Sequence, residues 1–295
     1  MVFSRRYSGE RFCSRCFLEN IVEKVRYTIS KYHLLKPFDK IAVAVSGGKD
    51  SLSLLKILAK IERDYPRASL VAITIDEGIP EYRDEAVKNA EEYVKKLGIP
   101  HHILSFKKLY GFTLTEVVEE GIVESLSLRP CTICGVLRRK ALTIAAKEVG
   151  ATVIATAHTL DDIVQTYILN IFRGDTRFTP IGIRREAEGV IPRVAPFRLI
   201  PEYEVVLYAY YSEIPFQTYV CPYTETSMRD PIRAFLIEYE ERFPGSLFSA
   251  LNSFERVFEK NFQESNMCVK CGDPTSRVIC RACELEEMIL EEMSH

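Results

Sequence analysis

Short apolar runs alternate with longer amphipathic segments through the first two thirds of the chain. Buried strands are predicted at 40–45 (KIAVAV), 70–75 (LVAITI) and 151–157 (ATVIATA), with a weaker strand at 102–106. Because the three strong runs are nearly continuous in apolar character and alternate with helices, they indicate an α/β fold, with a parallel sheet covered by helices on both faces. Helices are predicted at 17–32, 50–63, 85–97, 113–126, 132–149, 160–172, 202–211 and 230–241.

This alternation ends near Gly174, where a loop-rich stretch with several prolines begins, Pro180 among them. A short cysteine-rich tail follows from about residue 263. We therefore predict an N-terminal segment at 1–36, a main α/β domain at 37–260 and a cysteine-rich unit at 261–295.

Composition narrows the class of protein. The 295 residues carry a formal net charge of −2, so no overall field favours nucleic acid, and any such binding must come from local patches. No apolar run reaches 18 residues and no signal peptide is recognised. We therefore expect a cytoplasmic protein that does not enter a membrane.

The nine cysteines form four C-x-x-C pairs and one singlet. Two intervening residues are typical of metal or redox sites, and an odd total leaves a disulfide scheme incomplete. A reducing compartment fits this usage. The pairs are Cys13/Cys16, Cys131/Cys134, Cys268/Cys271 and Cys280/Cys283, and the singlet is Cys221.

The first predicted strand runs directly into SGGKDS and then a helix. Gly47 and Gly48 permit a phosphate to approach the backbone, and the amides at the helix start bind the anion. Lys49 can hold a phosphate oxygen, while Asp50 can hold Mg²⁺ or cap the helix. A plain strand-to-helix turn is the alternative. A Walker A loop is excluded because Asp50 stands where that motif has Ser or Thr.

A second polar cluster, HTLDD, follows the strand 151–157. Asp161 and Asp162 begin a helix at the sheet edge that also carries Ser46, since parallel strands end at one edge. Either carboxylate can bind Mg²⁺ or move a proton. Capping of the helix is the alternative.

Cys131 and Cys134 stand at a predicted helix start, where backbone amides favour thiolates and a redox pair is one interpretation. Cys221 offers a third thiolate, or is a buried apolar cysteine. Three thiolates can hold a [4Fe–4S] cluster and leave one iron open.

These motifs carry a family resemblance. SGGKDS resembles the PP-loop of N-type ATP pyrophosphatases, which bind the pyrophosphate of ATP and leave its α-phosphate open to attack. The series SGGKDS, CTICGVLRR, AHTLDDIVQTYILNIFRGD and CPYTETSMR, over about 38–240, resembles the TtcA/TtuA superfamily of tRNA thiolases. The lone third cysteine and the cysteine-rich tail favour the TtuA-like branch, whose fold is of the adenine nucleotide alpha hydrolase type.

The resemblance implies roles for individual residues. It implies that Cys131, Cys134 and Cys221 hold the cluster, that Asp162 is the catalytic aspartate, and that Lys49 and Asp50 act on ATP. Arg138 stands where TtuA enzymes have a lysine, and a guanidinium cannot donate a proton in the same way. The implied ATP-binding residues are Ala44, Val45, Ser46, Gly47, Gly48, Lys49, Asp50, Ser51, Ile75, Asp76, Arg138 and Ala157.

The ends of the chain differ in their metal-ligand content. Cys268, Cys271, Cys280 and Cys283 have the spacing of a compact Zn²⁺ knuckle with four thiolates. The N-terminal pair Cys13/Cys16 resembles only half of the finger that TtuA-like proteins carry there, so we expect an incomplete zinc site. Two groups of basic residues, one around the N-terminal cysteine pair and one after Cys134, are candidate tRNA phosphate contacts or ordinary surface charge. They are Arg5, Arg6, Arg11, Arg15, Arg138, Arg139 and Lys140.

Together these features predict an ATP-dependent tRNA 2-thiouridine synthase that uses ATP, Mg²⁺, a [4Fe–4S] cluster and Zn²⁺. Its partners would be tRNA and a sulfur donor, either free sulfide or a thiocarboxylated ubiquitin-like protein, and the resemblance implies a homodimer. A cytidine thiolase of the TtcA type, another PP-loop adenylating enzyme such as an amidating ligase, and a non-catalytic zinc protein that binds RNA are the alternatives.

Overall fold

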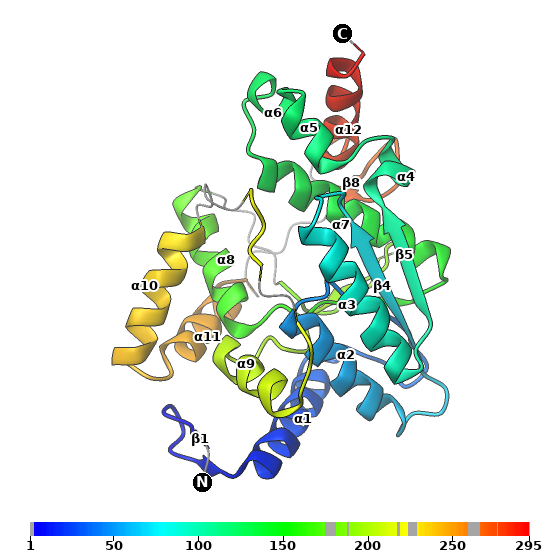
Figure 1. Ribbon diagram of the computed structural model, residues 1–295. Coiled ribbons are helices and arrows are strands. Elements are labelled where there is room, and N and C mark those ends of the chain that lie inside the picture. The colour runs from blue at the N-terminus through cyan, green and yellow to red at the C-terminus, as the bar shows by residue number, and fades with distance from the viewer. Residues whose placement is uncertain are drawn as a thin grey trace.

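The computed structural model describes residues 3–174, 181–187, 189–216, 219–223, 229–258, 266–275 and 277–294. Its centre is a parallel sheet of five strands in the order β5-β4-β3-β6-β7 (Figure 1). Pro180 and parts of the predicted loop around Cys221 lie outside the described residues. The strands are β3 (Lys40–Ala44), β4 (Ser69–Asp76), β5 (His101–Ser105), β6 (Val153–Ala155) and β7 (Arg193–Val194).

The α/β prediction is confirmed, and the four predicted strands are all present. Strand β7, which the sequence did not predict, pairs with β6 at the edge of the sheet. The chain leaves β3 toward β4 on one side and reaches β6 on the other, so the strand order reverses beside β3. In open parallel sheets, ligands bind at the carboxyl ends of strands at such a point.

Twelve helices and two small hairpins surround the sheet in the described chain. The predicted helix at 113–126 is two short helices, because Gly121 adopts a left-handed φ of 71° between them. The hairpins are β1 (Phe3–Ser4) with β2 (Arg11–Phe12), and β8 (Asn266–Met267) with β9 (Pro274–Thr275). The helices are α1 (Ser14–Lys31), α2 (Lys49–Glu62), α3 (Tyr82–Leu97), α4 (Phe106–Tyr110), α5 (Leu114–Glu119), α6 (Ile122–Ser125), α7 (Pro130–Glu148), α8 (Leu160–Phe172), α9 (Glu202–Tyr211), α10 (Arg229–Arg242), α11 (Ser246–Phe258) and α12 (Arg281–Glu292).

The apolar side chains form two main cores, one on each face of the sheet. Helices α1, α2, α3 and α9 pack on one face, through residues such as Phe17, Leu55 and Val205. On the other face, α7 contributes Leu137 and Ala141. A third cluster joins α8, α10 and α11, which lie to the left of the sheet in Figure 1. No described helix is long and apolar enough to span a bilayer.

The C-terminal unit docks on the outer side of α7. Asp273, beside β9, accepts ion pairs from Lys140 at 3.0 Å and from Lys147 at 3.2 Å, both on α7. Ile289 of α12 joins the core that α7 shares with the sheet. Helix α7, whose first turn carries Cys131 and Cys134, is therefore held between the sheet and the C-terminal unit.

The turn between β3 and α2 depends on a glycine. Gly47 has a φ of 88°, and a Cβ atom there would lie 2.1 Å from the carbonyl oxygen of Ala86 on α3. Hydrogen bonds close the turn: the Ser51 hydroxyl donates to the Gly48 carbonyl at 3.0 Å and accepts from the Ser46 amide at 3.1 Å. The turn is thus packed tightly against α3, with its amides at the start of α2.

Substituting Gly47 therefore tests this packing. We expect Gly47→Ala to lower the free energy of unfolding by on the order of 3 kcal/mol, because it combines a strained φ with a backbone clash. Gly48→Ala is the matched control: the new Cβ would meet only the Ser46 hydroxyl, at 3.6 Å. Chemical denaturation of the two variants makes the comparison, and equal stabilities would contradict the account of the turn.

Candidate functional site

A cleft of about 200 Å³ opens at the carboxyl edge of the sheet. It brings together the start of α7, the start of α8, the first residue of α9 and one side of α10. The sequence predicted three of its residues, namely Cys131, Asp161 and Asp162, and missed those from α9 and α10. The cleft is lined by Cys131, Asp161, Asp162, Gln165, Glu202, Arg229, Asp230, Arg233, Leu236 and Ile237.

The nucleotide loop reaches this cleft through Lys49. Its ammonium lies between Asp50 Oδ2, at 2.9 Å, and Glu202 Oε1, at 3.1 Å. Glu202 also binds the Arg233 guanidinium, at 2.7 and 2.8 Å. Nothing in the sequence placed Glu202 here, since it begins a helix far from the predicted motifs and its neighbours are set by the tertiary fold.

Asp50 has one oxygen without a partner. Its Oδ1 atom is buried and makes no hydrogen bond with any described residue. Burial raises the pKa of the Asp50 carboxyl, and the charges of Glu202 and Asp162 add to this, while Lys49 opposes it. A buried, unpaired carboxylate oxygen beside other carboxylates suits a divalent cation, because Mg²⁺ prefers oxygen ligands.

The acidic pair after β6 has two different environments. Asp162 caps α8 through Oδ2, which accepts from the Thr159 amide at 2.9 Å and from the Thr159 hydroxyl at 3.0 Å. The capping interpretation is therefore correct for one of its oxygens. Asp161 Oδ2 accepts the Glu202 amide at 2.7 Å, and burial raises the pKa of Asp161 to about 6.

The end of β4 lies beside the nucleotide loop. Ile75 is buried and its carbonyl accepts a hydrogen bond from Arg83, at 2.6 Å. Asp76 accepts the Gly78 amide at 2.9 Å. Ala44 pairs with Ile73 in the sheet, and the Val45 amide continues this pairing. Ala157 is half-buried just past β6. The adenine contacts predicted for Ile75, Asp76 and Ala157 stay predictions.

The predicted cysteine triad draws on two distant segments. Cys131 donates to the carbonyl of Tyr223 at 3.2 Å, which places it beside the segment of Cys221. Burial raises the pKa of Cys131 and raises that of Cys134 to about 12, and the Cys221 charge adds to both shifts. The sequence could pair these segments only through the family resemblance, because 92 residues separate Cys131 from Tyr223.

Arg138 follows Cys134 by one turn of α7. Its side chain is half-exposed and lies 3.4 Å from the carboxylate of Glu77, which is buried. Glu77 in turn forms an ion pair with Arg83, at 2.6 Å. Arg138 is thus linked to Arg83 through Glu77, a buried carboxylate that the sequence did not single out. The predicted contact of Arg138 with ATP stays a prediction.

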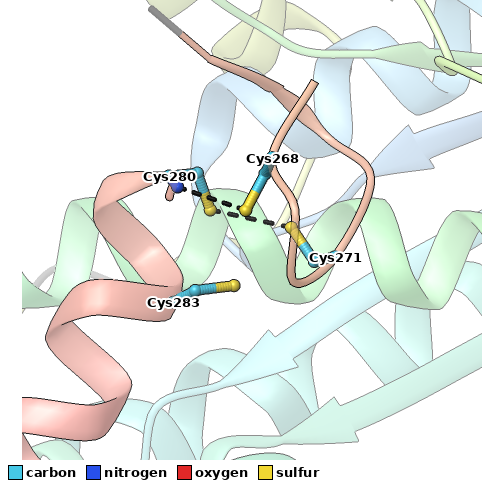
Figure 2. Close-up of side chains that lie close together, drawn as sticks. All are labelled: Cys268, Cys271, Cys280 and Cys283. Carbon is cyan, nitrogen blue, oxygen red and sulfur yellow. Dashed lines mark hydrogen bonds between the residues drawn. The ribbon is translucent and has the colours of Figure 1, made fainter. Parts of the chain in front are cut away.

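The C-terminal cysteines converge, as predicted. The sulfur atoms of Cys268, Cys271, Cys280 and Cys283 all lie within 4.8 Å of one another (Figure 2). Burial alone would raise the pKa of Cys268, but the backbone amides of Cys280, Cys271 and Lys270 outweigh it and lower that pKa to about 6. Four thiols with such backbone donors fit a tetrahedral Zn²⁺ site.

The N-terminal pair does not form such a group. Cys13 caps α1 by accepting the Cys16 amide at 3.4 Å, and both side chains are exposed. Among the described residues, the compact group of three or more potential metal ligands is the C-terminal one. The expectation of an incomplete zinc site at Cys13 and Cys16 stays a prediction.

Two of the basic residues considered for tRNA binding are not available. Arg5 is only 2% exposed, because it forms an ion pair with Glu204, at 3.0 Å, from a segment 199 residues away. Lys140 is largely buried against Asp273. The hypothesis of a phosphate contact is therefore wrong for these two, whereas Arg15 and Arg138 are exposed.

Comparisons with known proteins agree with this arrangement. Residues 18–240 match the family model described as the PP-loop domain. The chain is 36% identical to cytoplasmic tRNA 2-thiolation protein 1 of Drosophila yakuba, over 97% of this chain and 84% of that protein. It is 33% identical to a probable sulfurtransferase of Methanocaldococcus jannaschii, over 95% of this chain and 83% of that protein.

A solved structure has the same fold over almost its whole length. The U34-tRNA thiolase NcsA from Methanococcus maripaludis, solved with its [4Fe–4S] cluster, superposes with a TM-score of 0.85 at 31% identity. The match covers 97% of this chain and 92% of that one. The chain therefore belongs to the PP-loop domain family and, within it, to the group of the tRNA 2-thiolation proteins.

Proposed function

We propose that this protein is an ATP-dependent tRNA thiolase that converts a uridine to 2-thiouridine. The observation that carries the proposal is that Lys49 of the nucleotide loop binds Glu202, and that Glu202 lines the same cleft as Cys131 of the cysteine helix. The relatives named as tRNA 2-thiolation proteins and as a U34-tRNA thiolase support the choice of substrate. The description of the tRNA 2-thiolation proteins as cytoplasmic supports a location in the cytoplasm.

The reaction needs the carbonyl oxygen at C2 of uridine to become a leaving group. That oxygen attacks the α-phosphorus of ATP, the bond to pyrophosphate breaks, and an adenylated uridine forms. Sulfide then attacks C2, and AMP leaves with the former carbonyl oxygen. The balance is uridine, ATP and hydrosulfide giving 2-thiouridine, AMP and pyrophosphate.

The loop residues would supply the electrostatic part of this chemistry. Lys49 and the amides at the start of α2 would hold the pyrophosphate as negative charge develops on it. The unpaired oxygen of Asp50, with Asp161 and Asp162 nearby, would hold Mg²⁺. Lys49 already contacts the carboxylates of Asp50 and Glu202, so ATP and Mg²⁺ would share a site that is polar before they bind.

The cysteine triad fits an iron–sulfur cluster. Cys131 lies beside the segment that carries Cys221, and three thiolates can hold a [4Fe–4S] cluster and leave one iron open. The raised pKa values of Cys131 and Cys134 indicate that these thiols need a positive centre to ionise. When bound, a [4Fe–4S] cluster with one open iron would supply the sulfide. The sulfur donor upstream and the homodimer stay predictions.

We assign the C-terminal knuckle a structural role, with Zn²⁺ bound by its four cysteines. Its ion pairs with Lys140 and Lys147 attach it to α7. Binding of the metal would then stabilise the helix that carries Cys131 and Cys134. The knuckle would act on the reaction only through that helix.

The function is tested by mapping thiolated nucleosides by mass spectrometry. Purified protein with tRNA, ATP and sulfide is expected to form 2-thiouridine, and Asp50→Asn is expected to lower the rate at least about 100-fold, because the neutral amide lacks the negative charge that would hold Mg²⁺. Retained melting temperature in the variant shows that the fold survives. Formation of 2-thiocytidine, or of ADP in place of AMP, would contradict the proposal.

The zinc assignment predicts a specific metal content. Cys271→Ser is expected to lose zinc and to lower the melting temperature, since structural Zn²⁺ contributes on the order of 10 kcal/mol to the folding of small sites. Cys16→Ser is the matched control, because Cys16 is exposed and outside the knuckle. Elemental analysis decides: unchanged zinc in Cys271→Ser would refute the assignment.

The raised pKa of Asp161 predicts that the free energy of unfolding of the ligand-free protein depends on pH. Its pKa rises from an ordinary 3.8 to about 6 on folding, so the folded state binds the proton more tightly and loses stability as pH rises from about 4 through 6. Asp161→Asn keeps an acceptor for the Glu202 amide and removes the titration. We expect the variant to gain stability over the wild type between pH 5 and pH 8. The same difference in free energy of unfolding between variant and wild type at pH 5 and at pH 8 would contradict this.

A further inference from the structure

Arg83 sits between the nucleotide loop and the cysteine helix without lining the cleft. It lies in the first turn of α3 and is only 5% exposed. One guanidinium nitrogen donates to the Ser46 carbonyl at 2.9 Å, and the other donates to the Ile75 carbonyl at 2.6 Å. A single side chain thus ties the loop after β3 to the end of β4.

The third guanidinium nitrogen of Arg83 faces Glu77. Its Nε atom lies 2.6 Å from Glu77 Oε2, in an ion pair whose angles are not those of an aligned hydrogen bond. The other oxygen, Oε1, lies 3.4 Å from Arg138. The Glu77 carbonyl also accepts the Leu114 amide, at 2.8 Å, which fixes the backbone at this point.

Glu77 therefore bridges two elements that carry different halves of the chemistry. On one side, Arg83 holds the carbonyl of Ser46, the residue that opens the nucleotide loop. On the other, Arg138 lies one turn after Cys134 on α7. A buried carboxylate strongly requires its cationic partners, so the loop, Glu77 and α7 are coupled in position.

We propose that Arg83 and Glu77 are positioning residues that hold the nucleotide loop in register with the cysteine helix. The inference rests on the proposed function, because adenylation at the loop and sulfur attack from the cysteine side must meet at one carbon atom. A misplacement of about 1 Å can reduce a reaction rate on the order of 100-fold. Neither residue is among those that line the cleft.

The variants separate this role from general stability. Glu77→Gln removes the charge between the two guanidinium groups. Arg83→Lys keeps a positive charge but cannot reach Ser46, Ile75 and Glu77 together, because an ammonium lacks the planar fork of a guanidinium. The matched control is Arg184→Lys. The Arg184 side chain is also buried, pairs with Asp39 at 2.5 Å and donates to the Leu34 carbonyl, but its partner Asp39 directly precedes β3, at the amino end of that strand.

The readout is the amount of 2-thiouridine formed per AMP released. We expect Glu77→Gln and Arg83→Lys to lower this ratio at least about tenfold. The adenylated uridine still forms, but with sulfide misplaced, water attacks C2 instead, so that AMP leaves and uridine is regenerated. Arg184→Lys should keep the ratio of the wild type even if its melting temperature falls. The inference is overturned if Arg184→Lys forms as little 2-thiouridine per AMP as the site variants are expected to form. It is also overturned if this ratio is unchanged in both Glu77→Gln and Arg83→Lys.

Amide hydrogen exchange gives a second measurement that does not depend on activity. Both site variants should exchange faster than the wild type at 46–51 and at 131–138, whereas Arg184→Lys should not. If Glu77→Gln is too unstable to assay, the exchange of Arg83→Lys decides, since this variant keeps a positive charge beside Glu77. If the wild type forms no 2-thiouridine, the proposed function fails; if it does and the exchange at both segments is unchanged in the variants, the positioning role fails.

Discussion

The packing of Gly47 against the carbonyl of Ala86 determines where the nucleotide loop lies, and the candidate site depends on it. A side chain at that position would overlap the backbone of α3, so the loop can approach α3 this closely only with glycine. The same contact brings the Ser46 carbonyl to Arg83, which also belongs to α3. From there the start of α2 directs Lys49 and Asp50 toward Glu202.

Charge balance is the second constraint on the site. Several carboxylates meet at the carboxyl edge of the sheet, and burial raises the pKa values of Asp50 and Asp161. Lys49 and Arg233 offset part of this negative charge through Glu202. Buried carboxylates this close together destabilise the free protein, because their charges repel one another. A bound cation would relieve this repulsion, and binding sites commonly carry such local destabilisation.

The sequence predicted those parts of the fold that depend on local pattern. Strands β3, β4 and β6 are mostly apolar, and the glycine pair after β3 marks the loop, so their positions followed from periodicity and turn chemistry. Helix α11 was missed, and Gly121 divides a helix that the pattern joined. The ion pair of Arg5 with Glu204 could not be foreseen, because its partners are brought together only by the tertiary fold.

The candidate site divides in the same way. Its motif residues were predictable, whereas Glu202, Arg233 and the pair of Arg83 with Glu77 are seen only once α3, α9 and α10 are placed.

In the proposed reaction, the C2 oxygen of uridine is transferred to AMP at this cleft. The most direct test uses tRNA carrying ¹⁸O at that oxygen. The account predicts that the label appears in AMP and that the thiolated nucleoside has lost it; unlabelled AMP formed together with 2-thiouridine would contradict it.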